Sequence, residues 1–274
     1  GGGWDGGGVG RGVGGGLGRE GVEGSVDGKG RGGGSGVVDE AAGRVGWGAP
    51  GRNSGTLRRF CDELGPARCA ALTHVSADGA QWIHDTVTAR APQAVLGLDP
   101  FHIVGWATRE LDNVRRQTWN TRRGNEHGAA ATSVKGSRWA LLKNPGDLTP
   151  EQRGSVASIA KTNERLYRAY LLKEQLRAVF QIKGQTGREL LAGWIAWARR
   201  SQIPGFIALA KTLKRFQQLI WNTLNHSMSN AQSEATNTHL RALTRRAYGF
   251  HSPEALIAMA MLTRGGLCPP LPGR

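Results

Sequence analysis

Apolar residues in the first hundred positions follow two different periods. Residues 57–64 carry Leu, Phe, Cys and Leu at i, i+3, i+4 and i+7, which is the spacing of one helix face. Asn53 or Ser54 can cap this helix, and Cys61 falls on its buried side. The pattern predicts a short amphipathic helix.

Two short apolar runs follow this helix. Residues 72–76 end at Asp78-Gly79, and residues 94–98 end at Asp99-Pro100. A helical spacing over residues 80–90 lies between them. Strand, helix and strand at these lengths predict a sheet with a crossover connection.

From Phe101 onward the pattern is helical almost throughout. Helix start signals occur at Thr149-Pro150, Thr186, Ser229-Asn230 and Ser252-Pro253. Trp194 and Trp197 lie three apart on one predicted helix, which favours core packing over a base-stacking platform. The order of elements therefore predicts a helical domain set between α/β segments.

Glycine changes the picture at the N-terminus, since residues 1–48 hold 23 of the 42 glycines. Glycine loses much backbone entropy on folding and has no side chain to bury. We therefore expect an irregular segment over residues 1–36. A G-x-G-x-x-G match at Gly10, Gly12 and Gly15 is expected by chance in such a tract and follows no predicted strand, so it does not indicate a nucleotide loop.

The net charge of +15 over 274 residues is concentrated in one segment. Residues 107–225 carry 21 basic against 8 acidic side chains. Such a segment favours a polyanionic partner, above all DNA, although a solvated helical face would have the same composition. The cations expected to bind DNA without sequence preference are Arg115, Arg116, Arg122, Arg123, Lys135, Arg138 and Lys143.

Several classes of protein are disfavoured. Three cysteines do not make a disulfide scaffold, and neither they nor the seven histidines have the spacing of a zinc site. No apolar run is long enough to cross a membrane, and the N-terminus does not resemble a signal peptide. The expected location is cytoplasmic, in association with the nucleoid.

The scarce acidic residues are the best candidates for chemistry. Asp78 follows a predicted strand, and Glu234 shares one helix face with Asn237 and Arg241. Carboxylates brought together from a strand end and a helix can hold two divalent cations for phosphoryl transfer. A cap or a surface group remains the simpler interpretation of either residue alone.

Six stretches run colinearly along the chain, over residues 48–53 (GAPGRN), 74–80 (HVSADGA), 99–104 (DPFHIV), 138–145 (RWALLKNP), 167–174 (YRAYLLKE) and 248–257 (YGFHSPEALI). Together these stretches resemble the insertion-sequence transposases of the ISL-three family. The resemblance implies a DDE catalytic triad in a ribonuclease-H-like fold, with Asp78 as the second acid and Glu234 as the third. It further implies two Mg²⁺ (or Mn²⁺) ions, double-stranded DNA as the partner (transposon ends and target), and self-association on that DNA.

Two features depart from the family. Its first acid is an Asp on the first strand, and the position that matches is Glu23, with Asp27, Asp39 and Asp99 as further candidates. Glycine replaces most of the neighbouring strand residues. The zinc-binding and helix-turn-helix region that precedes the catalytic region in the family has no counterpart here, so a C-terminal fragment is expected.

The sequence thus predicts an α/β fold, a ribonuclease-H-like mixed sheet with a large all-α insertion and with its first two strands degraded. The expected parts are residues 1–36 (irregular), 37–106 (core), 107–225 (helical insertion) and 226–274 (core helices). A DDE transposase catalytic region is the leading hypothesis. An inactive remnant that only binds DNA, and a helical interaction module whose charge is merely solubilising, are the alternatives.

Overall fold

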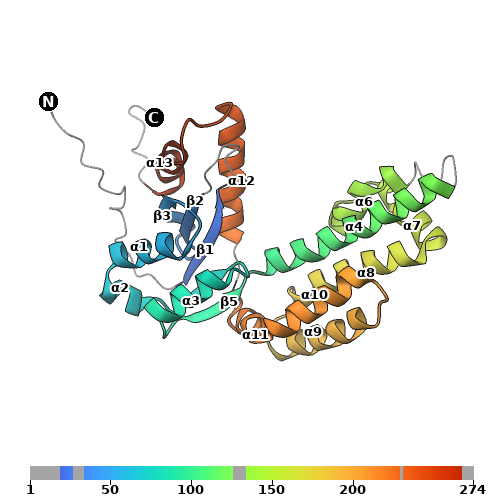
Figure 1. Ribbon diagram of the computed structural model, residues 1–274, viewed down its shortest axis with the longest axis horizontal. Helices are drawn as coiled ribbons and strands as arrows, with labels where there is room; N and C mark the ends of the chain where they lie inside the picture. The colour runs from blue at the N-terminus through green and yellow to red at the C-terminus, as the bar shows by residue number, and fades with distance from the viewer. Residues whose placement is uncertain (1–18, 27–33, 126–133, 229–230, 267–274) are drawn as a thin grey trace. The chain divides into compact units, whose positions relative to one another are not determined.

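The computed structural model describes residues 19–26, 34–125, 134–228 and 231–266, with the backbone alone over 19–26, 122–125 and 231 (Figure 1). The chain divides into two compact units, which are described separately. Residues 1–99 and 228–274 form an α/β unit, and residues 100–227 form a helical unit.

The α/β unit contains a five-stranded sheet in the order β3-β2-β1-β4-β5. β1 is antiparallel to β2 and parallel to β4, β2 is antiparallel to β3, and β4 is parallel to β5. The sheet is therefore mixed, as the sequence predicts. The strands are β1 (Arg19–Val26), β2 (Gly34–Asp39), β3 (Arg44–Pro50), β4 (His74–Ala77) and β5 (Val95–Leu98).

The prediction that the first two strands are degraded is wrong. β1 and β2 pair in register from Glu20 opposite Asp39 to Val26 opposite Gly34, with one irregularity near Glu23. The backbone ladder does not require side chains, and β1 is flanked by β2 and β4. β1 and the first three residues of β2 thus lie inside the segment expected to be irregular, and the two valines that follow on β2 supply the apolar anchors of that strand.

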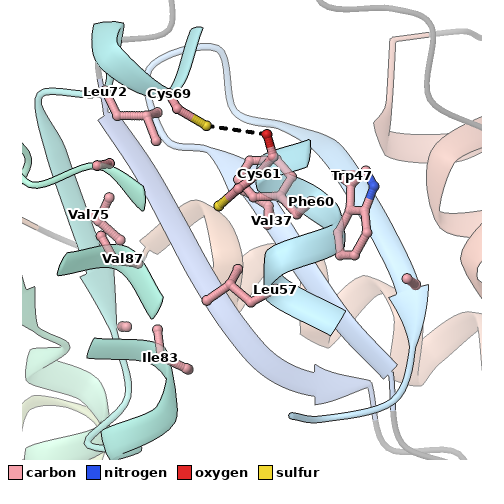
Figure 2. Packing of buried hydrophobic residues seen from close by; sticks show 13 residues of the cluster. Val37, Trp47, Leu57, Phe60, Cys61, Cys69, Leu72, Val75, Ile83 and Val87 are labelled. Carbon is pink, nitrogen blue, oxygen red and sulfur yellow. Dashed lines mark hydrogen bonds between the residues drawn. The ribbon is translucent and has the colours of Figure 1, made fainter. Parts of the chain in front are cut away.

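Successive valines on β2 point to opposite faces of the sheet, as the period of a strand requires. Val37 is 1% exposed and packs with Trp47, Leu57 and Phe60 (Figure 2). Val38 is also buried and packs with Val45 and Met261 on the other face. The sheet therefore has an apolar core on both sides.

Helices cover both faces. One face packs against α1 (Ser54–Leu64) and α3 (Gln81–Arg90). The short α2 (Pro66–Ala71) lies between these two helices in the sequence. The other packs against α12 (Ala231–Arg246) and α13 (Pro253–Arg264). Gly48 on β3 allows α13 to approach closely, because a Cβ there would lie 3.0 Å from Cγ2 of Ile257.

The helical unit begins with α4, a helix of 26 residues that starts directly after β5 and runs without a break through position 107. The basic composition predicts a segment that starts at 107, because the first turns of α4 are nearly uncharged and do not share that composition. The unit contains α4 (Pro100–Asn125), α6 (Arg138–Leu142), η1 (Pro145–Asp147), α7 (Pro150–Thr162), α8 (Glu164–Val179), α9 (Gly184–Arg199), α10 (Pro204–Arg215) and α11 (Gln217–His226).

The local helix signals have mixed outcomes. The capping boxes predicted at Thr149 and Thr186 differ: the first forms with Gln152, whereas Thr186 lies inside α9, whose first residue is Gly184. Ser252 caps α13 as predicted, and Ser229-Asn230 lies outside the described residues. Trp194 is fully buried and donates to the carbonyl of Leu172 (2.8 Å), which confirms its place in the core.

Candidate active site

Two parallel strands end at the same edge of the sheet, and each is followed by an aspartate. Asp78 comes directly after β4 and Asp99 directly after β5. The backbone N–H of Asp99 donates to the carbonyl of Ala77 (2.9 Å), which ties the two strand ends together. The carboxyl ends of neighbouring parallel strands are a common place for functional side chains in α/β folds.

Asp78 is half-buried and held in a defined orientation. Its Oδ1 accepts the backbone N–H of Ala80 (2.9 Å), and Nε2 of His84 donates to its main-chain carbonyl (3.1 Å). Burial lowers the pKa of His84, which favours the neutral ring. With His84 neutral, the carboxylate of Asp78 carries the charge at this strand end.

Glu23 lies on the strand next to Asp78. The last paired residues of β1 and β4 are Val22 and Ala77. Glu23 and Asp78 are the residues that follow this pair on neighbouring parallel strands, so their backbones lie side by side. The side chain of Glu23 is outside the described part of the chain, as is Asp27, another candidate for the first acid.

Glu234 lies in the first turn of α12, a helix that contacts β1, β2 and β3. Its pKa is raised, first by burial and then by the negative charge of Asp99, while Arg241 acts in the opposite direction. Because Asp99 follows β5, its effect on this pKa indicates that Glu234 is within electrostatic reach of the β5 end. The effect of Arg241 agrees with the predicted helix face.

Asp99 was only a reserve candidate in the sequence, and the structure gives it more weight. Its side chain is 1% exposed. Burial raises the pKa of Glu234 and of Glu40, and the charge of Asp99 raises both further. Raised pKa values of neighbouring carboxyl groups are a feature of functional sites.

Glu40 is a residue that sequence reasoning missed. It follows β2 and accepts hydrogen bonds from the start of α12: from the N–H of Gln232 (3.3 Å), the N–H of Ser233 (3.2 Å) and Oγ of Ser233 (2.7 Å). These partners lie 192 and 193 positions further along the chain. Glu40 thus serves as a remote cap of the helix that carries Glu234, and no spacing rule within a helix could reveal it.

Asp39, the remaining candidate for the first acid, has a different role. It is buried, and its Oδ1 accepts from the N–H of Ala41 (3.0 Å) and of Ala42 (2.8 Å). These bonds close the turn between β2 and β3. Asp39 is therefore accounted for as a turn residue.

The carboxylates of this edge have the chemistry of a divalent-cation site. Oxygen ligands suit Mg²⁺ and Mn²⁺, and the mutual repulsion of Glu234 and Asp99 is what a bound cation would offset. Among the described side chains, however, no group of three His, Cys, Asp or Glu is placed to hold a metal ion. The donor types fit, and a complete ligand set is not assembled by the described residues.

The cations predicted to bind DNA lie in different surroundings in the helical unit. Arg115 is buried and its guanidinium is held by Asp112 (2.7 Å), which argues against a direct phosphate contact. Arg116, Lys135, Arg138 and Lys143 are exposed. The side chains of Arg122 and Arg123, on the last turns of α4, are outside the described part of the chain.

A family of transposases matches the chain over residues 28–260: its model is described as "Transposase" and is that of the DDE transposases of the ISL3 type. This range includes Asp78, Asp99 and Glu234 and leaves out Glu23. The chain thus falls in the class of DNA transposases. It belongs to the ISL3 family of insertion-sequence transposases.

Curated relatives support the same family. The chain is 49% identical over 260 residues to the transposase for insertion sequence element IS1557 of Mycobacterium tuberculosis, covering 87% of this chain and 58% of that protein. It is 29% identical over 220 residues to the transposase for insertion sequence element IS1001 of Bordetella parapertussis, covering 80% of this chain and 54% of the relative. The chain therefore spans little more than half the length of these relatives. No solved structure gives a significant match.

None of the described helices is both long and apolar enough to span a membrane.

Proposed function

We propose that this chain is the catalytic region of a DDE transposase with a ribonuclease-H-like core. It would cleave DNA at the ends of an insertion sequence and join those ends to a target, associating with a second copy on the DNA. The single observation that carries the proposal is the register of β1 and β4. Continued by one residue, it makes Glu23 and Asp78 neighbours on parallel strands, next to the β5 end, where Asp99 acts electrostatically on Glu234 of α12.

The strand order supports the fold part of this proposal. A central strand antiparallel to β2 on one side and parallel to β4 and β5 on the other, with helices on both faces, is the arrangement that the family resemblance implies. The central position of β1 would hold the first acid in the middle of the sheet. In the sequence, the helical unit lies between β5 and α12, so Asp78 precedes it and Glu234 follows it.

Each acid has a proposed role. Asp78, Glu234 and Glu23 would hold two Mg²⁺ or Mn²⁺ ions, which when bound lower the pKa of an attacking water or 3′-hydroxyl and stabilise the leaving oxygen. The chain's own residues fix the geometry. The N–H of Ala80 orients Asp78, and Glu40 fixes the first turn of α12.

Glutamate at position 23 favours a second candidate, an inactive remnant that only binds DNA. Glutamate is one methylene longer than the aspartate of the family, and a displacement of ~1 Å in a reacting group can lower the rate by ~100-fold. In that case, DNA binding by the basic helical unit would be the only function of the chain.

Nicking of a labelled duplex that carries the ends of the element tests both candidates. We expect metal-dependent nicking that Glu23→Asp increases by about 100-fold and that Asp78→Asn and Glu234→Gln abolish. Asp147→Asn, an exposed aspartate of η1 in the helical unit, is the control and leaves nicking unchanged. DNA binding without nicking by the wild type and by Glu23→Asp would support the remnant instead.

A further inference from the structure

One carboxylate of the helical unit gathers three arginines. Asp112 on α4 lies 2.7 Å from Nη2 of Arg115, 3.4 Å from Nε of Arg116 and 3.9 Å from Nε of Arg138, which comes from α6. Three guanidiniums around one carboxylate leave an excess of two positive charges. The cluster therefore has the charge to hold an anion.

The excess charge faces outward. The side chains of Asp112 and Arg115 are only 18% and 9% exposed, so this pair neutralises itself in the interior. Arg116 and Arg138 are 60% and 53% exposed. Both of these exposed guanidiniums pair with the half-buried carboxylate of Asp112, and guanidinium groups suit the oxygens of a phosphate.

A groove of about 640 Å³ lies between α4, α6 and α10, and Arg116 and Arg138 are among its lining residues. The other lining residues include Asn113, Trp106 and Thr212, together with a second cation and a second acid, Arg109 and Glu110. The groove is large enough for a nucleotide, and its lining combines hydrogen-bonding groups with apolar surface.

An exposed tryptophan lies beside the cluster. Trp139 on α6 is 60% exposed, and the guanidinium carbon of Arg138 lies 5.2 Å from the centre of its ring. Proteins that bind single-stranded nucleic acids combine exposed aromatic rings with nearby cations, because the bases stack on the ring while the cations contact the phosphates.

The short helix α6, which carries Arg138 and Trp139, is anchored by buried contacts. Ala140 and Leu141 are buried, and Nζ of the buried Lys173 donates to the carbonyls of Leu141 (2.8 Å) and Lys143 (3.3 Å). Lys173 also pairs with Glu174, so its charge is compensated. Anchoring of this kind lowers the entropy lost when a ligand binds.

We propose that Arg116, Arg138 and Trp139 form a binding site for an unpaired nucleotide of DNA. Arg116 and Arg138 hold its phosphate, and the base stacks on the indole of Trp139. The base must be unpaired, because within a duplex both of its faces are covered by neighbouring bases. The inference rests on the proposed function in one respect, that DNA is the partner.

Anisotropy titrations with the full chain test the site. The probes are a labelled 12-nucleotide oligo-dT and a labelled 20-base-pair duplex, each at several salt concentrations. Trp139→Ala is expected to weaken oligo-dT binding by about 5- to 100-fold and to leave duplex binding unchanged, since stacking contributes only with an exposed base. Trp139→Phe is expected to restore most of the affinity.

Two further variants separate stacking from charge. Arg138→Gln should reduce the salt dependence of oligo-dT binding, with the slope of log K against log salt falling by about 0.7, whereas Trp139→Ala should leave that slope unchanged. Tyr248→Ala removes an aromatic ring of the α/β unit that is even more exposed than Trp139, and it is the control. Thermal melts confirm that each variant folds.

The outcomes distinguish the inference from the function on which it rests. If the wild type binds both probes and Trp139→Ala binds oligo-dT as tightly as the wild type, the nucleotide site is wrong and the transposase proposal stands. An equal loss on oligo-dT and duplex would also overturn base stacking. If the wild type binds neither probe, the proposed function fails together with the inference.

Discussion

Charged side chains lie in the interior of this protein at positions that sequence spacing marks poorly. Asp99, Arg115 and Lys173 are each less than one-tenth exposed. Burial of a charge is costly unless it is paired or hydrogen-bonded. Arg115 and Lys173 have such partners in Asp112 and Glu174. The charge of Asp99 acts on Glu40 and Glu234, which makes this edge of the sheet the candidate site.

The pH dependence of stability reports on Glu234. Its folded pKa is raised above 4.5, so the proton-bound form favours folding, and that contribution is lost as the pH rises through the folded pKa. Glu234→Gln should therefore raise the free energy of unfolding at pH 8 and have little effect below about pH 4, as measured by urea denaturation without divalent ions. Glu254→Gln, an exposed glutamate of the first turn of α13, should show no such gain.

At the scale of elements, the regular periodic segments could be predicted from the sequence. The helix caps at Asn53, Thr149 and Ser252 are where the pattern places them. The strands β1 and β2 could not be predicted, because their glycines carry no β-branched signal and their pairing is a property of the whole sheet. Asp78 and Glu234 were identifiable as candidates, whereas Glu40 acts across 193 residues and is visible only in three dimensions.

Removing the Glu40 cap tests how α12 is held. Glu40→Ala should destabilise the protein by about 1 kcal/mol, the usual cost of losing a helix cap, and should speed amide exchange in the first turn of α12. Hydrogen–deuterium exchange with mass spectrometry locates the effect.

Ser252→Ala, which removes the side-chain cap of α13, is the matched control. It should cost a similar free energy while leaving exchange at the start of α12 unchanged. Unchanged exchange there in Glu40→Ala would show that Glu40 does not hold this helix.

On the scale of the whole molecule, charge is divided unevenly between the two units. Residues 107–225 carry 21 basic and 8 acidic side chains, and all of them lie in the helical unit. The acidic candidate site lies in the other unit. Composition could predict this division, because charge is a property of segments. It could not predict that Arg115 is consumed by an internal ion pair.

The salt dependence of duplex binding follows from that division. Lys135→Gln and Lys143→Gln should each lower the slope of log K against log salt by about 1, because each exposed cation that contacts a phosphate releases one counterion equivalent. Arg115→Gln should lower stability and leave the slope unchanged. A flat salt response of the wild type would support a merely solubilising role for the charge.

The most direct test of the central claim is to map the metal site without relying on activity. Fe²⁺ bound in place of Mg²⁺ generates hydroxyl radicals with ascorbate and peroxide, and these cut the backbone nearest the ion. We predict cuts in separate segments around Glu23, Asp78 and Glu234, identified by mass spectrometry, which excess Mg²⁺ and Asp78→Asn suppress. Cuts near Asp78 without cuts near Glu234, or cuts that survive Asp78→Asn, would contradict the claim that these acids form one site.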